Sequence, residues 1–223
     1  MTVTVIVPTL NEESTLARLL DSLDEVRPDE VIVSDGGSTD RTIDIATGRA
    51  RVVSGPASRG MQLNAGAAAA SGDVLLFLHA DSRLDPSAVA EVRRALADPA
   101  VPGGNFDVHF DGGTWAAGAF TWINRQRRAW GVFYGDSAMF CRREVFTELG
   151  GFRPWPLLED YEFGRRLWRR GPLALLPTPV YVSSRRWLRA GLLPTMWSWF
   201  WVQALYLAGV SPYFLARLYR HVR

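Results

Sequence analysis

Eight residues from Val74 to Asp81, Val-Leu-Leu-Phe-Leu-His-Ala-Asp, constrain the fold of this chain more than any other stretch. Five consecutive apolar residues after Gly72-Asp73 are typical of a strand that is buried on both faces of a sheet. In open α/β sheets, ligands bind at the carboxyl edge of the strands. Because alternate residues of an extended chain point the same way, we expect His79 and Asp81 to project together there. A plain turn into a helix starting near residues 85–87 explains the same pattern.

Strand and helix patterns alternate through the first half of the chain. Apolar or β-branched runs predict strands at residues 3–7, 31–33, 51–53 and 74–79. Leucine spacing predicts a helix up to about residue 23, with Asn11 or Ser14 as its cap. Further helices are expected to begin near residues 40 and 59. This alternation is typical of an α/β protein with a parallel sheet covered by helices.

The second half of the chain is less regular. Alternating apolar and polar residues at 105–110 predict a half-exposed strand. Residues 114–130 are expected to form a helix with Trp115 and Trp122 on its buried side. The remaining predictions are a strand at 138–141, a turn at 150–152 and a helix at 159–170, which Gly171-Pro172 ends.

Composition excludes several classes of protein. The 223 residues suit one large domain, and a net charge of +2 with dispersed Arg residues disfavours nucleic acid as a partner. A single Cys141 excludes internal disulfides and fits a reducing compartment, so we expect a cytoplasmic protein. The first apolar run ends at Pro8 after five residues, which is too short for a signal peptide.

Polar side chains follow three of the predicted strands: Thr9, Asn11 and Glu12, then Asp35, then His79 and Asp81. Capping accounts for some of them, but three polar loops at one sheet edge favour a ligand site. Gly36-Gly37 does not match the dinucleotide-binding fingerprint, and the chain has no P-loop sequence. It also lacks the G-x-S-x-G pattern of hydrolases and any Cys/His metal spacing.

Four motifs occur in an ordered set: Pro8-Thr9-Leu10-Asn11-Glu12, Ser34-Asp35-Gly36-Gly37-Ser38-Thr39-Asp40, His79-Ala80-Asp81, and Leu158-Glu159-Asp160 followed by Arg165-Arg166-Leu167. The set resembles family 2 glycosyltransferases of the GT-A fold, over residues 3–187. The resemblance implies a Rossmann-type, mostly parallel sheet covered by helices. It also implies a domain over 1–190, with a nucleotide-binding half at 1–100 and an acceptor half at 101–190, followed by a helical extension at 191–223.

The resemblance implies a nucleotide-sugar donor and assigns nucleotide-binding positions to Pro8, Thr9, Asn11, Glu12, Asp35, Arg59, Gln62 and Ala80. Asp81 matches the last acid of the family's Asp-x-Asp metal motif, but His79 stands at the first. We therefore expect a divalent metal, Mg²⁺ or Mn²⁺, held by Asp81 and His79. The lost carboxylate weakens the site for Mg²⁺, whereas imidazole is acceptable to Mn²⁺. A hydrogen-bonded histidine at a strand end is the structural alternative.

The acidic pair Glu159-Asp160 matches the position of the general base in inverting members of the family. Asp160 is the expected base and Glu159 its reserve, because a carboxylate must take or orient the proton of the acceptor. Two acids in the first turn of a helix also have a purely structural explanation in the helix dipole. Asp136, Arg186 and Trp187 are assigned to the acceptor side.

Two further patterns bear on the acceptor. The pattern Arg59-Gly60-x-Gln62-x-Asn64-x-Gly66 and the triplet Tyr134-Gly135-Asp136 resemble a subgroup associated with arsenosugar and selenosugar biosynthesis. That resemblance implies a small anionic acceptor such as selenophosphate. Ser183 stands where processive relatives carry Gln, so a polymerase is not inferred.

The C-terminal segment from Gly191 to Ala216 carries no charged residue. The 17 residues between Pro194 and Pro212 would form a helix of roughly 26 Å, slightly short of a hydrocarbon core of about 30 Å. We expect it to associate without spanning, as a homodimer contact, at a membrane surface or as core.

The resemblance therefore implies a transferase that moves a sugar from a UDP-sugar to a small-molecule acceptor, with inversion. Two alternatives remain open. One is a polyprenyl-phosphate glycosyltransferase peripheral to a membrane, which the apolar tail favours. The other is a non-catalytic sugar-nucleotide-binding protein, which His79 and Ser183 favour.

Overall fold

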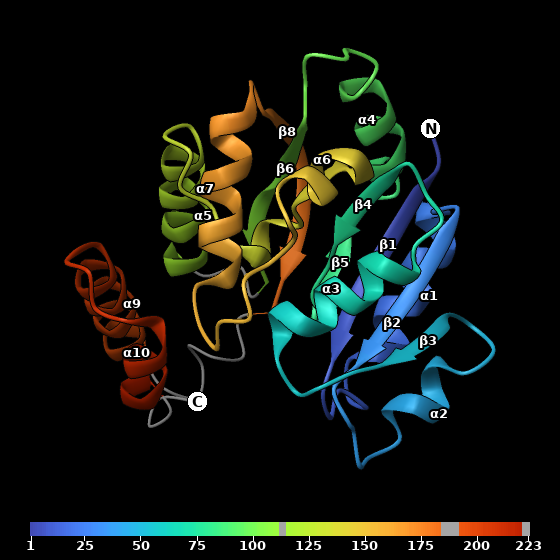
Figure 1. The fold of residues 1–223 in the computed structure, drawn as a ribbon, viewed down its shortest axis with the longest axis horizontal. Helices are drawn as coiled ribbons and strands as arrows, with labels where there is room; N and C mark the ends of the chain where they lie inside the picture. Colours follow the sequence, from blue (N-terminus) through green and yellow to red (C-terminus); the bar gives the residue numbers. More distant parts are fainter. Residues whose placement is uncertain (112–114, 184–191, 220–223) are drawn as a thin grey trace.

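The computed structural model describes residues 1–111, 115–183 and 192–219 (Figure 1). Within them a single sheet has the strand order β3-β2-β1-β4-β7-β6-β8-β5. Its parallel half consists of β1 (Val3–Thr9), β2 (Glu30–Asp35), β3 (Arg51–Ser54) and β4 (Val74–Phe77). The other half contains β5 (Ser82–Leu84), β6 (Gly103–Phe110), β7 (Phe140–Arg142) and β8 (Ala174–Val182). β7 runs antiparallel to β4 and β6, and β8 runs parallel to β6. The predicted α/β class with a mostly parallel sheet is confirmed.

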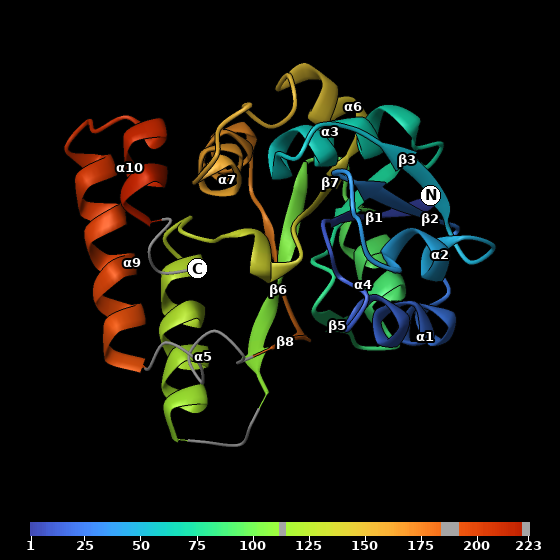
Figure 2. The same cartoon turned by 90° about the horizontal axis from the view of Figure 1, so that it is seen from below.

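Helices cover both faces of this sheet (Figure 2). One face is covered by α1 (Leu16–Val26) and α4 (Ala88–Ala95), the other by α3 (Arg59–Ala69), α6 (Arg143–Glu148) and α7 (Glu159–Arg170). The short helix α2 (Thr42–Ala46) follows β2. In α1, Leu16, Leu19 and Leu23 are 0–3% exposed, as their helical spacing predicts. Each face therefore has its own apolar core.

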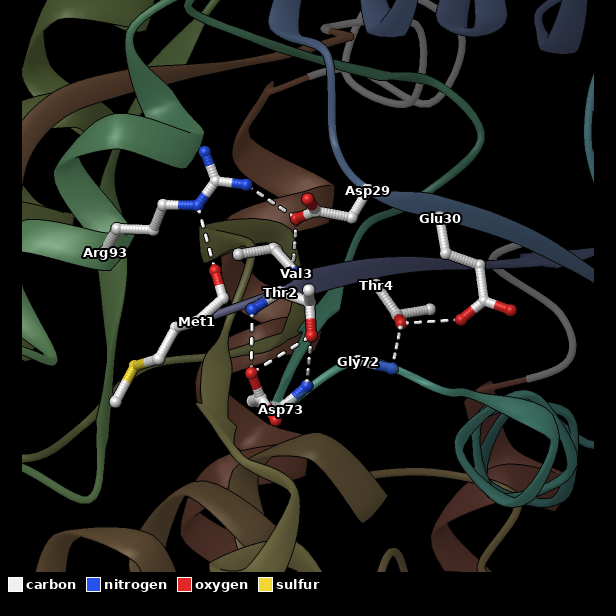
Figure 3. A network of polar contacts seen from close by, with 9 residues as sticks. All are labelled: Met1, Thr2, Val3, Thr4, Asp29, Glu30, Gly72, Asp73 and Arg93. Atoms are coloured by element: carbon white, nitrogen blue, oxygen red, sulfur yellow. Dashed lines mark hydrogen bonds and ion pairs between the residues drawn. The ribbon is translucent and has the colours of Figure 1, made fainter.

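The start of β1 is held by a polar network at the end of the sheet away from the predicted ligand edge (Figure 3). The backbone N–H of Val3 donates to Asp29 Oδ2 at 2.7 Å, and Arg93 Nη2 donates to the same oxygen at 2.6 Å. Thr4 Oγ1 donates to Glu30 Oε2 at 2.7 Å. These bonds place the first strand in register, so that its last residue, Thr9, lies beside the end of β2.

Two predictions about the early loops are wrong. β4 ends at Phe77, and the backbone N–H of Ser82 donates to the His79 carbonyl at 3.1 Å, so Ala80 and Asp81 lie in a turn. His79 and Asp81 therefore do not alternate along an extended strand. Likewise, α1 begins at Leu16, and neither Asn11 nor Ser14 caps it, because the residues before it are tied into the loop after β2.

Two predictions about the second half also fail. β6 is buried on both faces through Val108, including Asn105 and Asp107, because β7 and β8 flank it and α5 (Trp115–Arg128) packs against it. On α5, Trp115 and Trp122 are 81% and 62% exposed. The helix instead buries Phe120 and Arg128, whose guanidinium donates to Asp107.

The C-terminal helices α9 (Leu192–Leu207) and α10 (Pro212–Tyr219) stand side by side at one end of the molecule, next to α5 and α7 (Figures 1 and 2). Trp199 packs edge-on against Phe120 with ring centroids 5.9 Å apart, and Tyr206 packs on Tyr161 at 5.7 Å. No helix among residues 1–111, 115–183 and 192–219 is long and apolar enough to cross a bilayer.

Candidate active site

The ends of β1 and β2 are joined through a buried carboxylate. Thr9 and Asp35 are register partners, and Thr9 Oγ1 donates to Asp35 Oδ1 at 3.0 Å. The other oxygen of Asp35 accepts the backbone N–H groups of Gly37 and Ser38, each at 2.8 Å. Ser38 Oγ adds a fourth bond at 2.5 Å. Asp35 is thus the centre around which residues 35–38 fold.

The protonation of Asp35 follows from these contacts. Burial by itself raises its pKa, but the bonds from Ser38, Gly37 and Thr9 outweigh burial and hold the pKa below its usual range. The carboxylate is therefore ionised at neutral pH. A carboxylate offers about four lone-pair positions, and here four donors use them. A nucleoside contacting Asp35 would have to replace one of these donors, and Ser38 Oγ is the most adaptable.

Gln62 on α3 is hydrogen-bonded to the ends of the same two strands, β1 and β2. Its Nε2 donates to the carbonyl of Thr9 at 2.6 Å and to that of Ser34 at 3.1 Å, and the residue is 4% exposed. A Cβ on Gly36 would lie 2.9 Å from Gln62 Nε2. Gly36 is therefore required by close packing, and both donors of the Gln62 amide hold the loop.

The loops after β1 and β2 are joined further out. The backbone N–H of Asn11 donates to Ser38 Oγ at 2.9 Å, and Asn11 Oδ1 accepts the N–H of Thr39 at 2.9 Å. The backbone N–H of Glu12 donates to Thr42 Oγ1 at 2.8 Å. Predicted nucleotide-binding residues of two motifs thus form one connected surface, although Asn11 and Glu12 hold it together through bonds of their own.

The loop after β4 meets the second half of the chain at Gly135, the first residue of the short helix η1 (Gly135–Ser137). A Cβ on Gly135 would lie 2.7 Å from His79 Nε2 and 3.0 Å from Asp160 Oδ2. The side chains of His79, in the loop after β4, and of Asp160, on α7, therefore face the same glycine. In the sequence these two residues belong to separate motifs, His79 to the predicted metal motif and Asp160 to the predicted catalytic pair.

Asp160 and Glu159 open α7, and both are almost fully buried. Asp160 Oδ2 accepts the N–H of Gly135 at 2.8 Å, and Oδ1 accepts the N–H of Tyr161 at 2.7 Å. Arg59, at the start of α3, brings its Nε to 3.4 Å from Glu159 Oε1 and its Nη1 to 4.0 Å from Asp160 Oδ2. One helix, α3, thus contacts the donor-side loops through Gln62 and the acidic pair through Arg59.

Arg59 is the cationic centre of this acidic surface. Burial lowers the pKa of its guanidinium, but Glu159, Asp160, Asp81 and Asp136 together raise it above its ordinary value. The Arg59 side chain is 33% exposed, so an incoming anion can reach it. Two of these carboxylates, Glu159 and Asp160, lie within 4.0 Å of the guanidinium, and any phosphate bound here would compete with them for it.

Backbone strain is concentrated beside these residues. Four non-glycine residues within the described ranges have positive φ. Three of them, Asn11 at 56°, Ala138 at 47° and Leu158 at 64°, flank candidate site residues. Leu158 directly precedes the acidic pair. Such conformations cost about 1–3 kcal/mol each and cluster at functional sites.

Tyr134 connects the site to the C-terminal helices. Its ring stacks on Tyr161 at 5.6 Å, and its hydroxyl donates to Gln203 Oε1 of α9 at 2.7 Å. Burial raises the pKa of the Tyr134 hydroxyl, which keeps it neutral. Asp136 follows on η1, half-buried and close enough to raise the pKa of Arg59.

The described side chains do not provide a complete set of protein ligands for a divalent cation. The described part of the chain contains no group of three or more His, Cys, Asp or Glu placed to share one metal ion. Mg²⁺ and related ions at phosphate sites, however, often use one or two carboxylates together with substrate oxygens. Asp81, with or without His79, fits a cation completed by a bound diphosphate, and it does not fit a cation held by protein alone.

Most predicted residues are thus brought to one edge of the sheet. Pro8 lies half-buried in β1, and Ala80 is 4% exposed in the turn after β4. The acceptor-side predictions Arg186 and Trp187 lie outside the described residues. The sequence-based predictions did not include Ser38 as a hydrogen-bond donor to Asp35, or Leu158 as a residue with a strained backbone. The Asx-type spacing of Asp35 and Ser38 is a signal for the first, but nothing in the sequence marks the second.

A mostly parallel sheet with helices on both faces, and with these loops at its carboxyl edge, is a fold of the GT-A type. The solved structure of S. aureus TarS residues 1–349 in complex with UDP-GlcNAc aligns with a TM-score of 0.65 over 82% of this chain, at 17% identity. At that identity the likeness establishes the shared fold, and the chain spans 59% of the TarS chain.

Residues 4–150 match the family described as Glycosyl transferase family 2, and the chain belongs to that family. It is 28% identical over 195 residues to the PGL/p-HBAD biosynthesis glycosyltransferase of Mycobacterium bovis, covering 81% of this chain and 75% of the relative. The glucosyl-3-phosphoglycerate synthase of Mycobacterium tuberculosis, in complex with Mn²⁺, UDP and glucosyl-3-phosphoglycerate, aligns with a TM-score of 0.57 at 26% identity, covering 82% of this chain and 70% of that chain. The protein is therefore an enzyme, a glycosyltransferase, rather than a non-catalytic sugar-nucleotide-binding protein.

Proposed function

We propose that this glycosyltransferase takes a UDP-sugar as donor and transfers the sugar, with inversion, to a small acceptor. Support for the donor comes from the UDP-GlcNAc and UDP complexes of the structures it resembles. The observation that carries the proposal is the position of Asp160, whose carboxylate is held by the Gly135 N–H at 2.8 Å with Arg59 at 4.0 Å. A carboxylate and a cation thus stand together where acceptor and diphosphate would meet.

Asp160 acts as the general base in this proposal. Two backbone N–H groups, of Gly135 and Tyr161, each bind one of its oxygens. These bonds fix the orientation of the carboxylate, while each oxygen keeps a second lone pair for the acceptor proton. Glu159 is the reserve, but its proximity to Arg59 Nε suits it better to positioning that guanidinium.

Arg59 and a divalent metal would share the charge of the leaving nucleoside diphosphate. The guanidinium is one-third exposed and already lies in the site, so its position requires little reorganisation. Asp81, assisted by His79, would hold a divalent metal whose coordination is completed by phosphate oxygens of the donor. When bound, that metal would supply Lewis-acid stabilisation of the developing negative charge.

The acceptor is proposed to be a small anion, of the class that selenophosphate represents. The basis is the likeness of residues 59–66 and 134–136 to the arsenosugar and selenosugar subgroup. The geometry is compatible with an anion because Arg59 lies within 4.0 Å of the proposed base. An already ionised nucleophile needs orientation more than deprotonation, so a base that is partly neutralised by a guanidinium suits it.

A lipid-linked acceptor such as a polyprenyl phosphate is the second candidate. One observation favours it: α9, whose outer side chains are apolar, reaches the site loop through the bond from Tyr134 to Gln203. The relative in M. bovis is named for PGL/p-HBAD biosynthesis. Both candidates present a phosphorus-centred anion to the same site.

The proposal is tested in two steps. A panel of nucleotide sugars is first screened for protection against thermal unfolding, since a ligand of the native state raises the midpoint. The best donor is then incubated with selenophosphate, thiophosphate and polyprenyl phosphate, and the anomeric configuration of the product is read by NMR. Inversion with a UDP-sugar supports the proposal. Retention, or protection only by other nucleotides, contradicts it.

A further inference from the structure

Acidic and basic residues are distributed unevenly along this chain, although its net charge is only +2. All 23 acidic residues lie at or before Glu162, whereas the 61 residues from Phe163 to Arg223 hold ten of the 25 basic residues and no acid. Four of those Arg residues, Arg165, Arg166, Arg169 and Arg170, lie on α7, and Arg217 lies on α10. Such an asymmetry points to an anionic partner for the C-terminal part of the protein.

The same part of the molecule carries exposed aromatic side chains. On α9, Trp197, Phe200 and Trp201 are 65%, 60% and 45% exposed. Their rings contact one another, with centroids 5.6–6.3 Å apart, so they form one continuous surface. α10 adds Tyr213 and Phe214, each 54% exposed. A cluster of this size on the surface marks an interaction site.

Basic side chains border this apolar surface. A cleft of about 190 Å³ lies between α7 and the end of α9, and its lining includes Arg165, Arg169 and Tyr206. Arg166 also lines it, but its charge is engaged by Glu162 at 2.7 Å. The cleft meets the apolar surface at Leu207, which is 65% exposed. Membrane-interface helices combine apolar and aromatic side chains with Arg, and here α9 supplies the first and α7 the second.

We propose that the outer face of α9 and α10 docks on an anionic phospholipid bilayer, with Trp197, Phe200 and Trp201 entering the interface and Arg165 and Arg169 meeting headgroups. Trp is enriched at that depth. A second copy of the chain is a poorer occupant, because a twofold contact would place one acid-free, Arg-rich segment against another.

Docking would have a consequence for the site. Gln203 of α9 accepts a hydrogen bond from the hydroxyl of Tyr134, the residue before Gly135. The hydroxyl of Tyr213 on α10 donates to the Pro154 carbonyl at 3.2 Å. The helices that meet the bilayer thus pack directly on the segments that carry Gly135 and Asp160. The acceptor side of the enzyme would therefore face the membrane, whichever acceptor it uses.

The test is co-sedimentation of the full-length protein with sucrose-loaded vesicles of phosphatidylcholine alone or with 30% phosphatidylglycerol. The wild type is expected to sediment with the anionic vesicles and to stay in solution with the neutral ones. Trp197→Ser with Phe200→Ser should lower the partition coefficient about tenfold or more, because each large apolar side chain leaves water on docking. Arg165→Gln with Arg169→Gln should lower it roughly tenfold to thirtyfold.

Matched controls come from the other end of the molecule, where α1 and α2 lie (Figure 1). Ile43→Ser removes an apolar side chain that is 37% exposed, and Arg18→Gln with Arg41→Gln removes two charges. Neither should alter vesicle binding. Circular dichroism and the thermal midpoint verify that every variant is folded, so loss of binding reports the surface itself.

Three outcomes would overturn the docking proposal. The first is wild-type protein that stays in solution with anionic vesicles. The second is a vesicle-free dimer in sedimentation velocity that Trp197→Ser with Phe200→Ser converts to monomer, since a second copy would then cover the face. The third is single-stranded RNA binding that depends on the same four residues while vesicle binding does not. Donor hydrolysis plays no part in these measurements, so failure of the proposed function would leave them interpretable.

Discussion

The backbone N–H of Gly135 donates to Asp160 Oδ2 at 2.8 Å, across 25 residues of sequence. The same glycine approaches His79 so closely that a Cβ would lie 2.7 Å from its Nε2. One residue without a side chain therefore sets the separation between the loop after β4 and the start of α7. That separation governs how the proposed metal ligands face the proposed base.

Gly135→Ala is the most direct test of this relationship. The added methyl would lie 3.0 Å from Asp160 Oδ2 as well as 2.7 Å from the imidazole, so one of them must move. We expect kcat to fall about 100-fold, as a displacement near 1 Å can cause, with UDP affinity nearly unchanged. Steady-state kinetics and calorimetry measure the two quantities.

Gly118→Ala on α5 is the matched control, because nothing lies within 4 Å of the Cβ it would add. A helix-interior Gly→Ala change should raise the free energy of unfolding by about 0.5–1 kcal/mol and leave kcat unchanged. If Gly135→Ala is as active as Gly118→Ala, the close approach at Gly135 has no catalytic consequence.

Asp160→Asn tests the base and, through it, the acceptor. With a hydroxyl acceptor kcat should fall by about 10²–10⁴, because general-base help of that size is lost. With a selenium or sulfur anion the loss should be smaller. One of the two N–H groups of Gly135 and Tyr161 loses its oxygen partner, so the thermal midpoint is measured alongside. Full activity of both Asp160→Asn and Glu159→Gln would remove the acidic pair from the mechanism.

Asp35→Asn should destabilise the fold in a pH-dependent way. The variant removes a buried charge that accepts four hydrogen bonds, so we expect a loss of about 2–4 kcal/mol in the free energy of unfolding at pH 7. The pKa of Asp35 is depressed in the folded state, so its stabilisation is present above the unfolded pKa, near 3.9, and is lost as pH falls through the folded pKa. Urea titrations between pH 7 and pH 3 should show the gap between variant and wild type closing only below about pH 4. A gap that is constant over that range would contradict the linkage.

His79→Asp addresses the metal. If His79 is a ligand, the second carboxylate should shift preference toward Mg²⁺, a hard cation that favours oxygen ligands. Activity and UDP affinity are measured with Mg²⁺, with Mn²⁺ and with chelator. An unchanged ranking would assign His79 to the structural packing at Gly135 instead, and His79→Asn, close in size to Asp and uncharged, separates the charge from the shape.

Local patterns predicted a large part of this structure. The predicted strands at 3–7 and 31–33 are strands of a parallel sheet, as is the run predicted at 74–79 up to Phe77, and polar residues after them do meet at its edge. These predictions succeeded because a run of β-branched and apolar residues is a local signal, and parallel strands carry their loops to one side. The α7 prediction of 159–170 agrees with the structure for the same reason, since its apolar spacing and its stop at Gly171 are both local.

The failures share a different cause. Asp107 looked solvent-facing by alternation, yet it is 2% exposed because Arg128 and Arg125 from α5 reach it there. Burial raises the pKa of Asp107, and these guanidinium groups with His109 lower it further than burial raises it. Trp115 was predicted on the buried side of its helix but is 81% exposed, because the neighbours that decide its exposure lie elsewhere in the chain.

The sequence by itself indicated the strands β1 to β4, β6 and β7, the family and the charged residues at the sheet edge, but not β5 or β8. Tertiary structure alone decided that Gly135 would bring His79 and Asp160 together, that Arg59 would lie beside Glu159 and Asp160, and that Leu158 would take a left-handed conformation. The physical reason is the distance along the chain over which each kind of interaction acts. Periodicity records which side of an element is apolar, whereas the contacts of a polar side chain depend on segments that only the folded chain brings within a few ångströms.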